Sequence, residues 1–128
     1  MRRESGWSSS YWTSAVVAEG LRFPNGLALS ADERYLYCAQ TSGADVVRFP
    51  IHEGGALGAG GRYGPVLGKL QAPGGEPVAK ADLGYTDGIG LDAEGNLWVC
   101  LPGADKIVAI TPELEVVTVL HDPTGEIV

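Results

Sequence analysis

Two segments of the chain, residues 25–30 and 87–92, alternate bulky apolar residues with small or polar ones. The bulky positions are Leu27, Leu29, Ile89 and Leu91. Because successive residues of a β-strand point to opposite faces of a sheet, this period of two predicts a strand with one small face in each segment. A strand of this kind is one that another layer approaches closely.

Turns and further apolar runs follow both segments in the same order. The predicted strands are residues 35–39, 45–51 and 76–83 in the first unit and 97–100, 106–111 and 116–121 in the second. Another apolar run, residues 15–21, predicts a strand ahead of both units. Four antiparallel strands per unit is the arrangement of a β-propeller blade.

The two units are copies of one sequence pattern. Pro24-Asn25-Gly26-Leu27-Ala28-Leu29 matches Thr86-Asp87-Gly88-Ile89-Gly90-Leu91 at a spacing of 87 − 25 = 62, and Leu36-Tyr37-Cys38-Ala39 matches Leu97-Trp98-Val99-Cys100 at 98 − 37 = 61. A repeat of this length indicates arrayed supersecondary units. The sequence therefore predicts an all-β fold, a partial β-propeller of about two four-stranded antiparallel blades.

Both ends of the chain extend beyond these two blades. The expected organisation is an amino-terminal tail at 1–14 and a partial propeller at 15–128, made of the last strand of a preceding blade at 15–21, a first blade at 25–84, a second blade at 87–121 and the start of a further blade at 122–128. A propeller closes with roughly four to eight blades, so two blades leave apolar end faces open. We therefore expect a homo-oligomer, or blades supplied by a partner; three copies would complete a six-bladed ring.

Composition limits the choice of partners. The chain has 128 residues, enough for one domain, and its 9 basic and 16 acidic residues give a net charge of −7. That charge argues against nucleic acid and anionic membranes as partners. No apolar run approaches the roughly 18 residues of a membrane helix, and the polar tail Met1–Ser10 lacks the apolar stretch of a secretory signal. A soluble, cytoplasmic protein is expected.

The two cysteines are not expected to form a disulfide. Cys38 matches Val99 in the repeat, so Cys38 and Cys100 are one position out of step in equivalent strands. Neighbouring strand positions face opposite sides of a sheet, which points the two thiols apart. Both residues are expected to act as small buried hydrophobes.

Asn25 and Asp87 are the candidate site residues. Each carries a side-chain oxygen at the equivalent point of its repeat, just before the first strand. In a propeller the first strand of each blade lines the central channel, so equivalent residues converge at one end of it. The alternative is that Asn25-Gly26 and Asp87-Gly88 are ordinary turn dipeptides.

The chain resembles the gluconolactonase and regucalcin family of six-bladed propellers, also called the senescence marker protein family. The resemblance rests on Phe23-Pro24-Asn25-Gly26-Leu27-Ala28-Leu29-Ser30 with Leu36-Tyr37, and on Asp87-Gly88-Ile89 through Asp92-Ala93-Glu94-Gly95-Asn96-Leu97-Trp98-Val99. It covers roughly residues 15 to 128. The ordered pair of motifs, with a long connection between them, is more specific than either motif alone.

The resemblance implies that Asn25 and Asp87 are two ligands of one divalent cation and that Asp87 also serves as the catalytic acid or base. It further implies a metal-dependent sugar-lactone hydrolase, or a fragment of one, that opens a small-molecule lactone with metal-activated water. The family's third ligand, a Glu, and its substrate-holding residues have no counterpart in this chain. Ca²⁺ is the first choice for an amide and a carboxylate oxygen, and Zn²⁺, Mn²⁺ or Mg²⁺ are compatible.

Two other functions stay open at this point. One is a non-catalytic propeller module that binds a partner, which the missing third ligand favours. The other is a propeller protein of the strictosidine synthase type, which shares the architecture without the same metal site. Among the remaining residues, Asp32 and Asp92 are expected to bond the backbone of their own turns, and Tyr37 and Trp98 to pack between blades.

Overall fold

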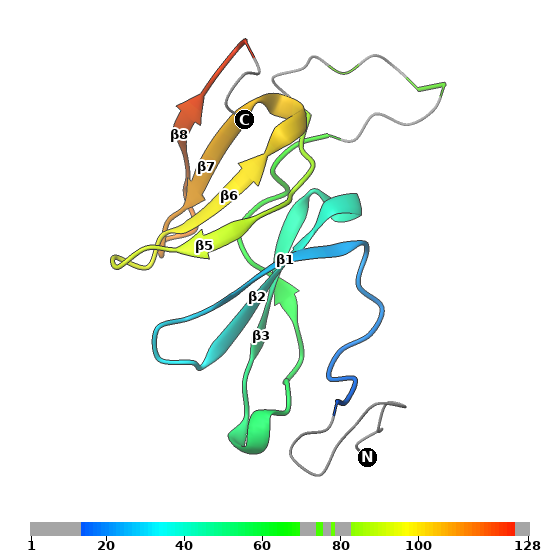
Figure 1. The fold of residues 1–128 in the computed structure, drawn as a ribbon, viewed down its shortest axis with the longest axis vertical. Helices are drawn as coiled ribbons and strands as arrows, with labels where there is room; N and C mark the ends of the chain where they lie inside the picture. Colours follow the sequence, from blue (N-terminus) through cyan, green and yellow to red (C-terminus); the bar gives the residue numbers. More distant parts are fainter. Residues whose placement is uncertain (1–13, 70–73, 76–77, 79–82, 125–128) are drawn as a thin grey trace.

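The computed structural model describes residues 14–69, 74–75, 78 and 83–124. These residues form two four-stranded antiparallel sheets in which strands that follow one another along the chain are neighbours (Figure 1). The first sheet contains β1 (Pro24–Leu29), β2 (Tyr35–Gln40), β3 (Asp45–Pro50) and β4 (Gly61–Arg62), and the second contains β5 (Ile89–Leu91), β6 (Leu97–Leu101), β7 (Lys106–Ile110) and β8 (Val116–His121). The all-β prediction of two four-stranded blades is confirmed.

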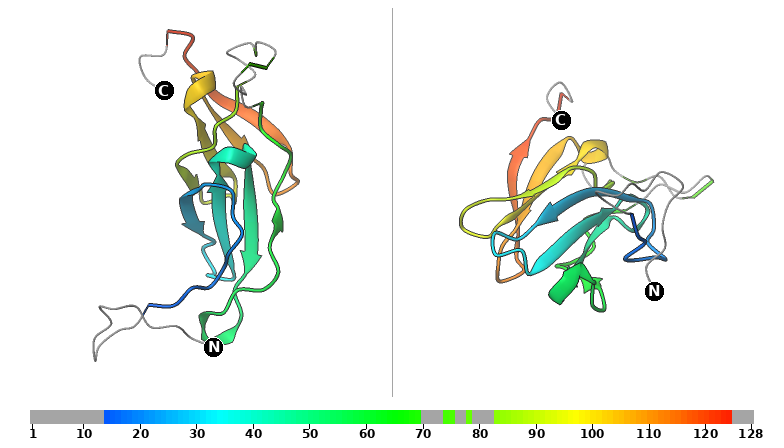
Figure 2. Two further views of the ribbon diagram at one scale, coloured as in Figure 1. Left: turned by 90° about the vertical axis from the view of Figure 1, so that its right-hand side faces the viewer. Right: turned by 60° about the horizontal axis from the view of Figure 1, so that its bottom comes forward.

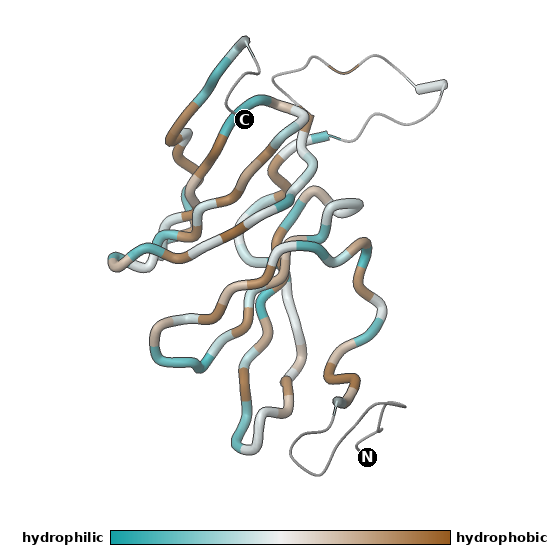
Figure 3. Tube along the Cα trace, viewed as in Figure 1, coloured by the Kyte–Doolittle hydropathy of each residue, from teal (hydrophilic) through white to brown (hydrophobic). Residues whose placement is uncertain are grey.

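Short 3₁₀ turns connect some of these strands: η1 (Thr41–Gly43), η2 (Glu53–Gly55) and η4 (Pro102–Ala104). Apolar residues concentrate in the strands, whereas the turns at the ends of the sheets are more polar (Figure 3). No helix of the described part is long and apolar enough to cross a membrane.

Strand pairing follows the sequence repeat. Leu27 pairs with Cys38 in the first sheet, and Ile89 pairs with Val99 in the second. Directly opposed residues of an antiparallel pair lie on the same face of the sheet, so each pair defines an equivalent face of its blade. The repeat in sequence is therefore a repeat in three dimensions.

The β5–β6 turn is held by the carboxylate of Asp92. Its Oδ1 accepts hydrogen bonds from the backbone N–H groups of Glu94 (3.0 Å) and Asn96 (2.9 Å), and its Oδ2 accepts from Asn96 Nδ2 (3.0 Å) and Trp98 Nε1 (2.9 Å). In the equivalent turn, Asp32 accepts from Ser30 Oγ and the backbone N–H of Arg34. Both aspartates bond their own turns, as predicted.

The hydrophobic core lies between the two sheets, which are stacked on one another (Figure 2). Its buried members are Tyr37, Val46, Tyr63, Leu97, Val99, Leu101, Ala104, Val108 and Ile110. The Tyr37 and Tyr63 rings meet edge to face at 5.0 Å, and the Arg48 guanidinium lies 4.2 Å from the centre of the Tyr35 ring. Such contacts stabilise the fold beyond the effect of removing the aromatic rings from water.

The packing prediction holds for Tyr37 and fails for Trp98. The Tyr37 side chain is buried between the sheets, whereas Trp98, its counterpart in the repeat, is 41% exposed. The reason is geometric, because Trp98 lies on the face of the second sheet that points away from the first. No described segment covers that face.

Two predicted strands are not seen in the described part. Among the described residues, the fourth strand of the first sheet is β4, Gly61–Arg62, which pairs with Val47 and Arg48 of β3. Of the predicted strand at 76–83, residues 76–77 and 79–82 lie outside the described part, so that strand stays a prediction. Residues 15–21 are described but form no strand, because no neighbouring strand offers hydrogen bonds to them. The tail at 1–13 and residues 125–128 also lie outside the described part.

Both cysteines are free thiols. Cys38 is 1% exposed and Cys100 is half-buried, so the role of a buried hydrophobe fits Cys38 better than Cys100. Burial raises the pKa of the Cys38 thiol, and a hydrogen bond from the Asn25 backbone acts in the opposite direction. The Cys38 thiol is therefore adjacent to the backbone of Asn25.

The turn hydrogen bonds predict the pH response of Trp98. The bonds from Trp98 and Asn96 lower the pKa of Asp92 below its ordinary value of 3.8. The Trp98 indole N–H signal in ¹H–¹⁵N NMR spectra should therefore shift with a midpoint below 3.8. Because the folded-state pKa is the lower one, the stabilisation from Asp92 is present above 3.8 and disappears as pH falls through the folded-state pKa.

Trp98→Phe identifies the signal, and Asp92→Asn serves as the control that should remove the transition. A midpoint at or above 3.8 would show that Asp92 is not bonded to the indole in solution.

Candidate functional site

The first strands of the two sheets come together at Gly26. A Cβ atom on Gly26 would collide with the backbone carbonyl oxygen of Asp87 and would lie 3.1 Å from Gly88 Cα and 3.1 Å from the Ile89 nitrogen. Only a glycine fits this close approach of two backbones. The structure thus brings the backbones of Asn25 and Asp87, the two predicted site residues, to one place where β1 and β5 meet.

Both side chains are exposed at this junction. The backbone of Asp87 is fixed to β6, because its N–H donates to the Cys100 carbonyl (3.2 Å) and the Cys100 N–H donates to the Gly88 carbonyl (3.0 Å). Asn25 is fixed through its side chain, since its Nδ2 donates to Thr41 Oγ1 (3.3 Å). The carboxylate of one residue and the amide of the other are therefore presented to solvent from anchored positions.

Thr41 determines which way the Asn25 amide points. The Thr41 hydroxyl donates its only proton to the Thr86 carbonyl oxygen at 2.7 Å. Its oxygen can then only accept a bond, so Nδ2 of Asn25, and not Oδ1, must face it. The Oδ1 atom of Asn25 is consequently turned away from Thr41.

A buried polar network lies under the junction and joins the two sheets. Thr86, which precedes Asp87, is 0% exposed, and its hydroxyl donates to the Asp45 backbone carbonyl at 3.2 Å. The Asp45 carboxylate, 2% exposed, accepts hydrogen bonds from Gln40 Nε2 (2.9 Å) and Arg62 Nε (3.1 Å). These partners satisfy the buried carboxylate. Removing one of them would leave a buried charge without compensation, which destabilises the folded state.

Sequence reasoning did not identify Thr41, Thr86 or Asp45 as part of the site. The repeat offered no signal for them, because the residues that match Thr86 and Asp45 are Pro24 and Lys106, which cannot make the same bonds. The one clue was position, since Thr86 directly precedes Asp87.

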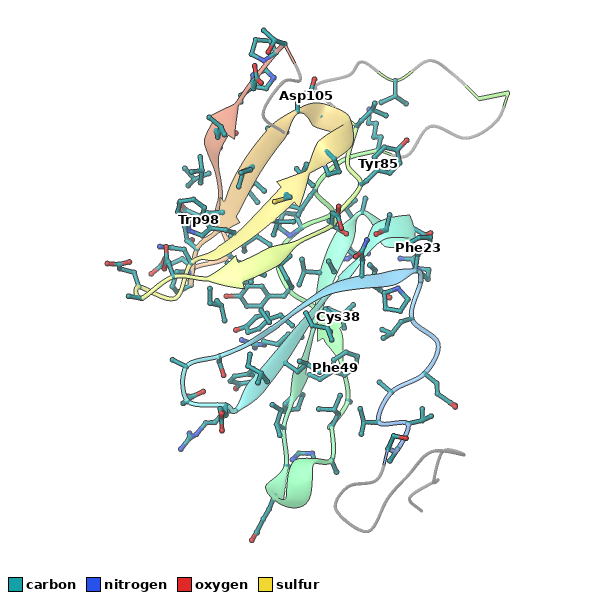
Figure 4. The ribbon with its side chains drawn as sticks, in the orientation of Figure 1. Phe23, Cys38, Phe49, Tyr85, Trp98 and Asp105 are labelled. Carbon is teal, nitrogen blue, oxygen red and sulfur yellow. The ribbon has the colours of Figure 1, made fainter. Side chains whose placement is uncertain are left out.

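An apolar pocket of about 340 Å³ lies on the other side of Asn25. Its walls are Val16, Val17, Ala18, Leu21, Pro24, Asn25, Leu27, Leu36, Cys38, Phe49 and Leu57. Asp87 does not line it, so this pocket is not a cleft shared by the two site residues. In Figure 4, Cys38 and Phe49 lie on the first sheet.

The described residues contain no group of three or more His, Cys, Asp or Glu side chains that could hold a metal ion. What the junction supplies is two exposed oxygen donors, one neutral and one charged. Any further ligands have to come from water or from other blades of a propeller.

Residues 7–127 match the family model described as the SMP-30/gluconolactonase/LRE-like region. The chain belongs to this family. The resemblance seen in the sequence motifs is thereby confirmed, and the match extends over almost the whole chain.

Two curated proteins are similar to this chain. The chain is 30% identical over 107 residues to protein strictosidine synthase-like 13 of Arabidopsis thaliana, covering 83% of this chain and 21% of that protein. It is 31% identical over 90 residues to the putative sugar lactone lactonase YvrE of Bacillus subtilis, covering 69% of this chain and 26% of that protein. The chain thus spans about a quarter or less of the length of these relatives.

Solved structures show the same fold. A gluconolactonase from Xanthomonas campestris is 25% identical and superposes with a TM-score of 0.61, covering 82% of this chain and 30% of that structure. Regucalcin from Agrobacterium tumefaciens, described as a calcium-binding protein, is 19% identical with a TM-score of 0.54 and covers 73% of this chain and 28% of that structure. A share of about 30% fits two blades of a six-bladed propeller.

The close approach at Gly26 predicts the effect of adding one methyl group there. Gly26→Ala should destabilise the fold by about 1–3 kcal/mol, because the backbone carbonyl of Asp87 must shift to make room. Urea denaturation followed by circular dichroism measures the difference.

Gly90→Ala is the matched control in the equivalent first strand, where an added Cβ meets nothing within 4 Å. Its stability should stay the same or rise slightly, since alanine also restricts the unfolded chain. Equal losses in the two variants would contradict the close approach.

Proposed function

We propose that this chain supplies two blades of a metal-dependent sugar-lactone hydrolase, with Asn25 and Asp87 as two of the ligands of the cation. The observation that carries the proposal is the junction at Gly26, where the backbones of both residues meet and both side chains are exposed. Family membership supports it, as does similarity to a putative sugar lactone lactonase and to a gluconolactonase.

The donor atoms fit a hard divalent cation. Asn25 offers an amide oxygen whose orientation is fixed by Thr41, and Asp87 offers a carboxylate that brings negative charge. Oxygen ligands of this kind suit Ca²⁺, and a site with open positions also accepts Mg²⁺, Mn²⁺ or Zn²⁺. The calcium-binding description of the Agrobacterium regucalcin makes Ca²⁺ the first cation to test.

Each residue has a distinct role in lactone opening. A bound cation would polarise the lactone carbonyl and acidify a water molecule. Asp87 is the general base of the pair, because a carboxylate oxygen can take the proton of the attacking water whereas the amide of Asn25 cannot. The hydroxide adds to the carbonyl carbon, the ring C–O bond breaks, and the proton held on Asp87 passes to the ring alkoxide. Asn25 helps to position the cation, and its amide neither gives nor takes a proton in the reaction.

The division of roles predicts unequal effects on metal binding. Calorimetric titration with Ca²⁺, Zn²⁺ and Mn²⁺ should show weak binding by the wild type, abolition by Asp87→Ala and weakening by Asn25→Ala. Asp87 matters more because its charge offsets the dehydration of the cation. Hydrolysis of a simple aldonolactone should be slow in the isolated chain, because two protein ligands leave the site incomplete.

Glu94→Gln is the control for loss of one exposed carboxylate, and it should bind like the wild type. If the wild type binds none of the three cations, or Asp87→Ala binds equally well, the metal-site proposal is wrong.

The role of Thr41 yields a separate prediction. Thr41→Val removes the acceptor that orients the Asn25 amide, so the dissociation constant for the cation should rise on the order of tenfold, the lower end for lost outer-shell partners. Thr41→Ser keeps the hydroxyl and should restore wild-type affinity. If Thr41→Val binds the cation with unchanged affinity, the Asn25 amide keeps its orientation without Thr41.

The same titrations bear on the alternatives. The similarity to strictosidine synthase-like 13 covers more of this chain than the similarity to the sugar lactone lactonase, which keeps a strictosidine synthase-like function as the second candidate. A wild type that binds no cation favours that candidate or a non-catalytic binding module.

A further inference from the structure

The apolar pocket beside Asn25 is built from two parts of the chain. β1, β2 and β3 of the first sheet contribute one part of its wall, which includes Leu27, Cys38 and Phe49, and most of the rest comes from residues 16–21. Figure 1 shows this segment, in blue, passing alongside the first sheet before it enters β1. The volume of about 340 Å³ lies at the lower end of the range for small-molecule sites, roughly 300–1,000 Å³.

The pocket offers a ligand a hydrocarbon surface with one polar point. Among the described residues that line it, Asn25 alone has an amide, hydroxyl or charged side chain. Cys38 adds only a thiol, which is a weak hydrogen-bond partner. A hydroxyl or a charge placed deep in this space would lose its bonds to water without replacement, which is unfavourable. The part of a ligand that enters the pocket is therefore a hydrocarbon.

Asn25 connects the pocket to the candidate site. It lines the pocket and belongs to the junction where β1 meets the backbone of Asp87. An amide nitrogen carries two protons, and the bond to Thr41 Oγ1 at 3.3 Å uses one of them. The second proton can be donated to a carbonyl oxygen. A molecule with its carbonyl at Asn25 thus has an apolar part in the pocket and a reacting group next to Asp87.

The charges at the junction select a neutral polar end. The side chain of Asp87 is exposed there, and the described residues that line the pocket include no cation. A fatty-acid carboxylate at Asn25 would therefore meet a like charge without a compensating one. The ester carbonyl of a lactone, by contrast, is an uncharged acceptor.

We propose that the pocket holds the hydrocarbon substituent of a lactone whose ring carbonyl lies at Asn25. The inference rests on the proposed function for its reacting group, and it adds the substrate class: lactones that carry an apolar chain on the ring. Leu27, 62% exposed as a wall of the pocket, removes that chain from water. Recognition of the chain and chemistry on the ring are thereby assigned to different residues, Leu27 and Asp87.

The dependence of affinity on chain length tests the proposal. Calorimetric titrations of the wild-type chain, in EDTA, use γ-lactones with ethyl, butyl, hexyl and octyl side chains. Each added methylene should raise the affinity up to roughly fourfold until the pocket is full, which corresponds to about 0.8 kcal/mol per buried methylene. Octanoate has as many carbons as the butyl lactone and should bind on the order of tenfold more weakly, because its charge cannot be compensated.

Three variants separate the pocket from its polar point. Leu27→Asp places a charge on the wall, so it should lower the affinity for the hexyl lactone on the order of tenfold and flatten the dependence on chain length. Leu29→Asp is the matched control, because Leu29 is 52% exposed on the same strand and is not among the residues that line the pocket. Asn25→Ala should weaken all four lactones by a common factor and keep the dependence on chain length, because it removes the contact with the ring.

Val17→Asp, at a wall residue that is 54% exposed, replaces Leu27→Asp if the circular dichroism of that variant differs from the wild type. An affinity that does not change with chain length overturns the proposal. So do equal losses in Leu27→Asp and Leu29→Asp, full affinity in Asn25→Ala, or octanoate that binds as tightly as the butyl lactone. Because EDTA removes cations, a chain that binds long-chain lactones but no cation keeps this inference and refutes the proposed metal ligands.

Discussion

The close contact between the backbones at Gly26 and Asp87 sets how the two sheets are joined. Without a side chain at Gly26, β1 and β5 can approach until the Asp87 carbonyl occupies the space where a Cβ would be. That distance allows Tyr37 to be buried and places Asn25 beside Asp87. Core and candidate site therefore depend on the same close contact between β1 and the start of the second sheet.

Polar interactions reinforce this contact from below. Thr41 and Thr86 cross between the sheets, and the buried Asp45 carboxylate is satisfied by Gln40 and Arg62. The bonds of Thr41 and Thr86 are directional, so they favour one relative position of the sheets, whereas the bonds to the Asp45 carboxylate hold β2, β3 and β4 of the first sheet together. The exposed site residues thus lie above a network whose central groups, Thr86 and Asp45, are buried.

The predictable part of the fold was the part that repeats. The strands that contain Leu27 and Tyr37 could be predicted because each of these residues has a counterpart 61 or 62 residues later, Ile89 for Leu27 and Trp98 for Tyr37. Sequence reasoning failed where the two units differ. The two residues of β4 are too few to show a period, and residues 15–21 have an apolar pattern but no strand to pair with.

Burial was less predictable than strand position, since it depends on what lies across the face. Tyr37 and Trp98 occupy the same place in their strands and differ only in whether a sheet covers them. The candidate pair was visible in the sequence, but the orientation of the Asn25 amide was not. This orientation depends on the hydrogen bond that the Thr41 hydroxyl donates to the Thr86 carbonyl oxygen, and the two threonines belong to different blades.

The two sheets end in strands of different length, β4 in the first sheet and β8 in the second. The first sheet ends in the two residues of β4, too short to template another strand, whereas the second ends in Val116–His121, six exposed residues that include three valines. A long, apolar and uncharged edge exposes unpaired N–H and C=O groups to any other strand. Rising concentration therefore favours the addition of a strand from another molecule at β8 rather than at β4, which has too few backbone groups to pair with one.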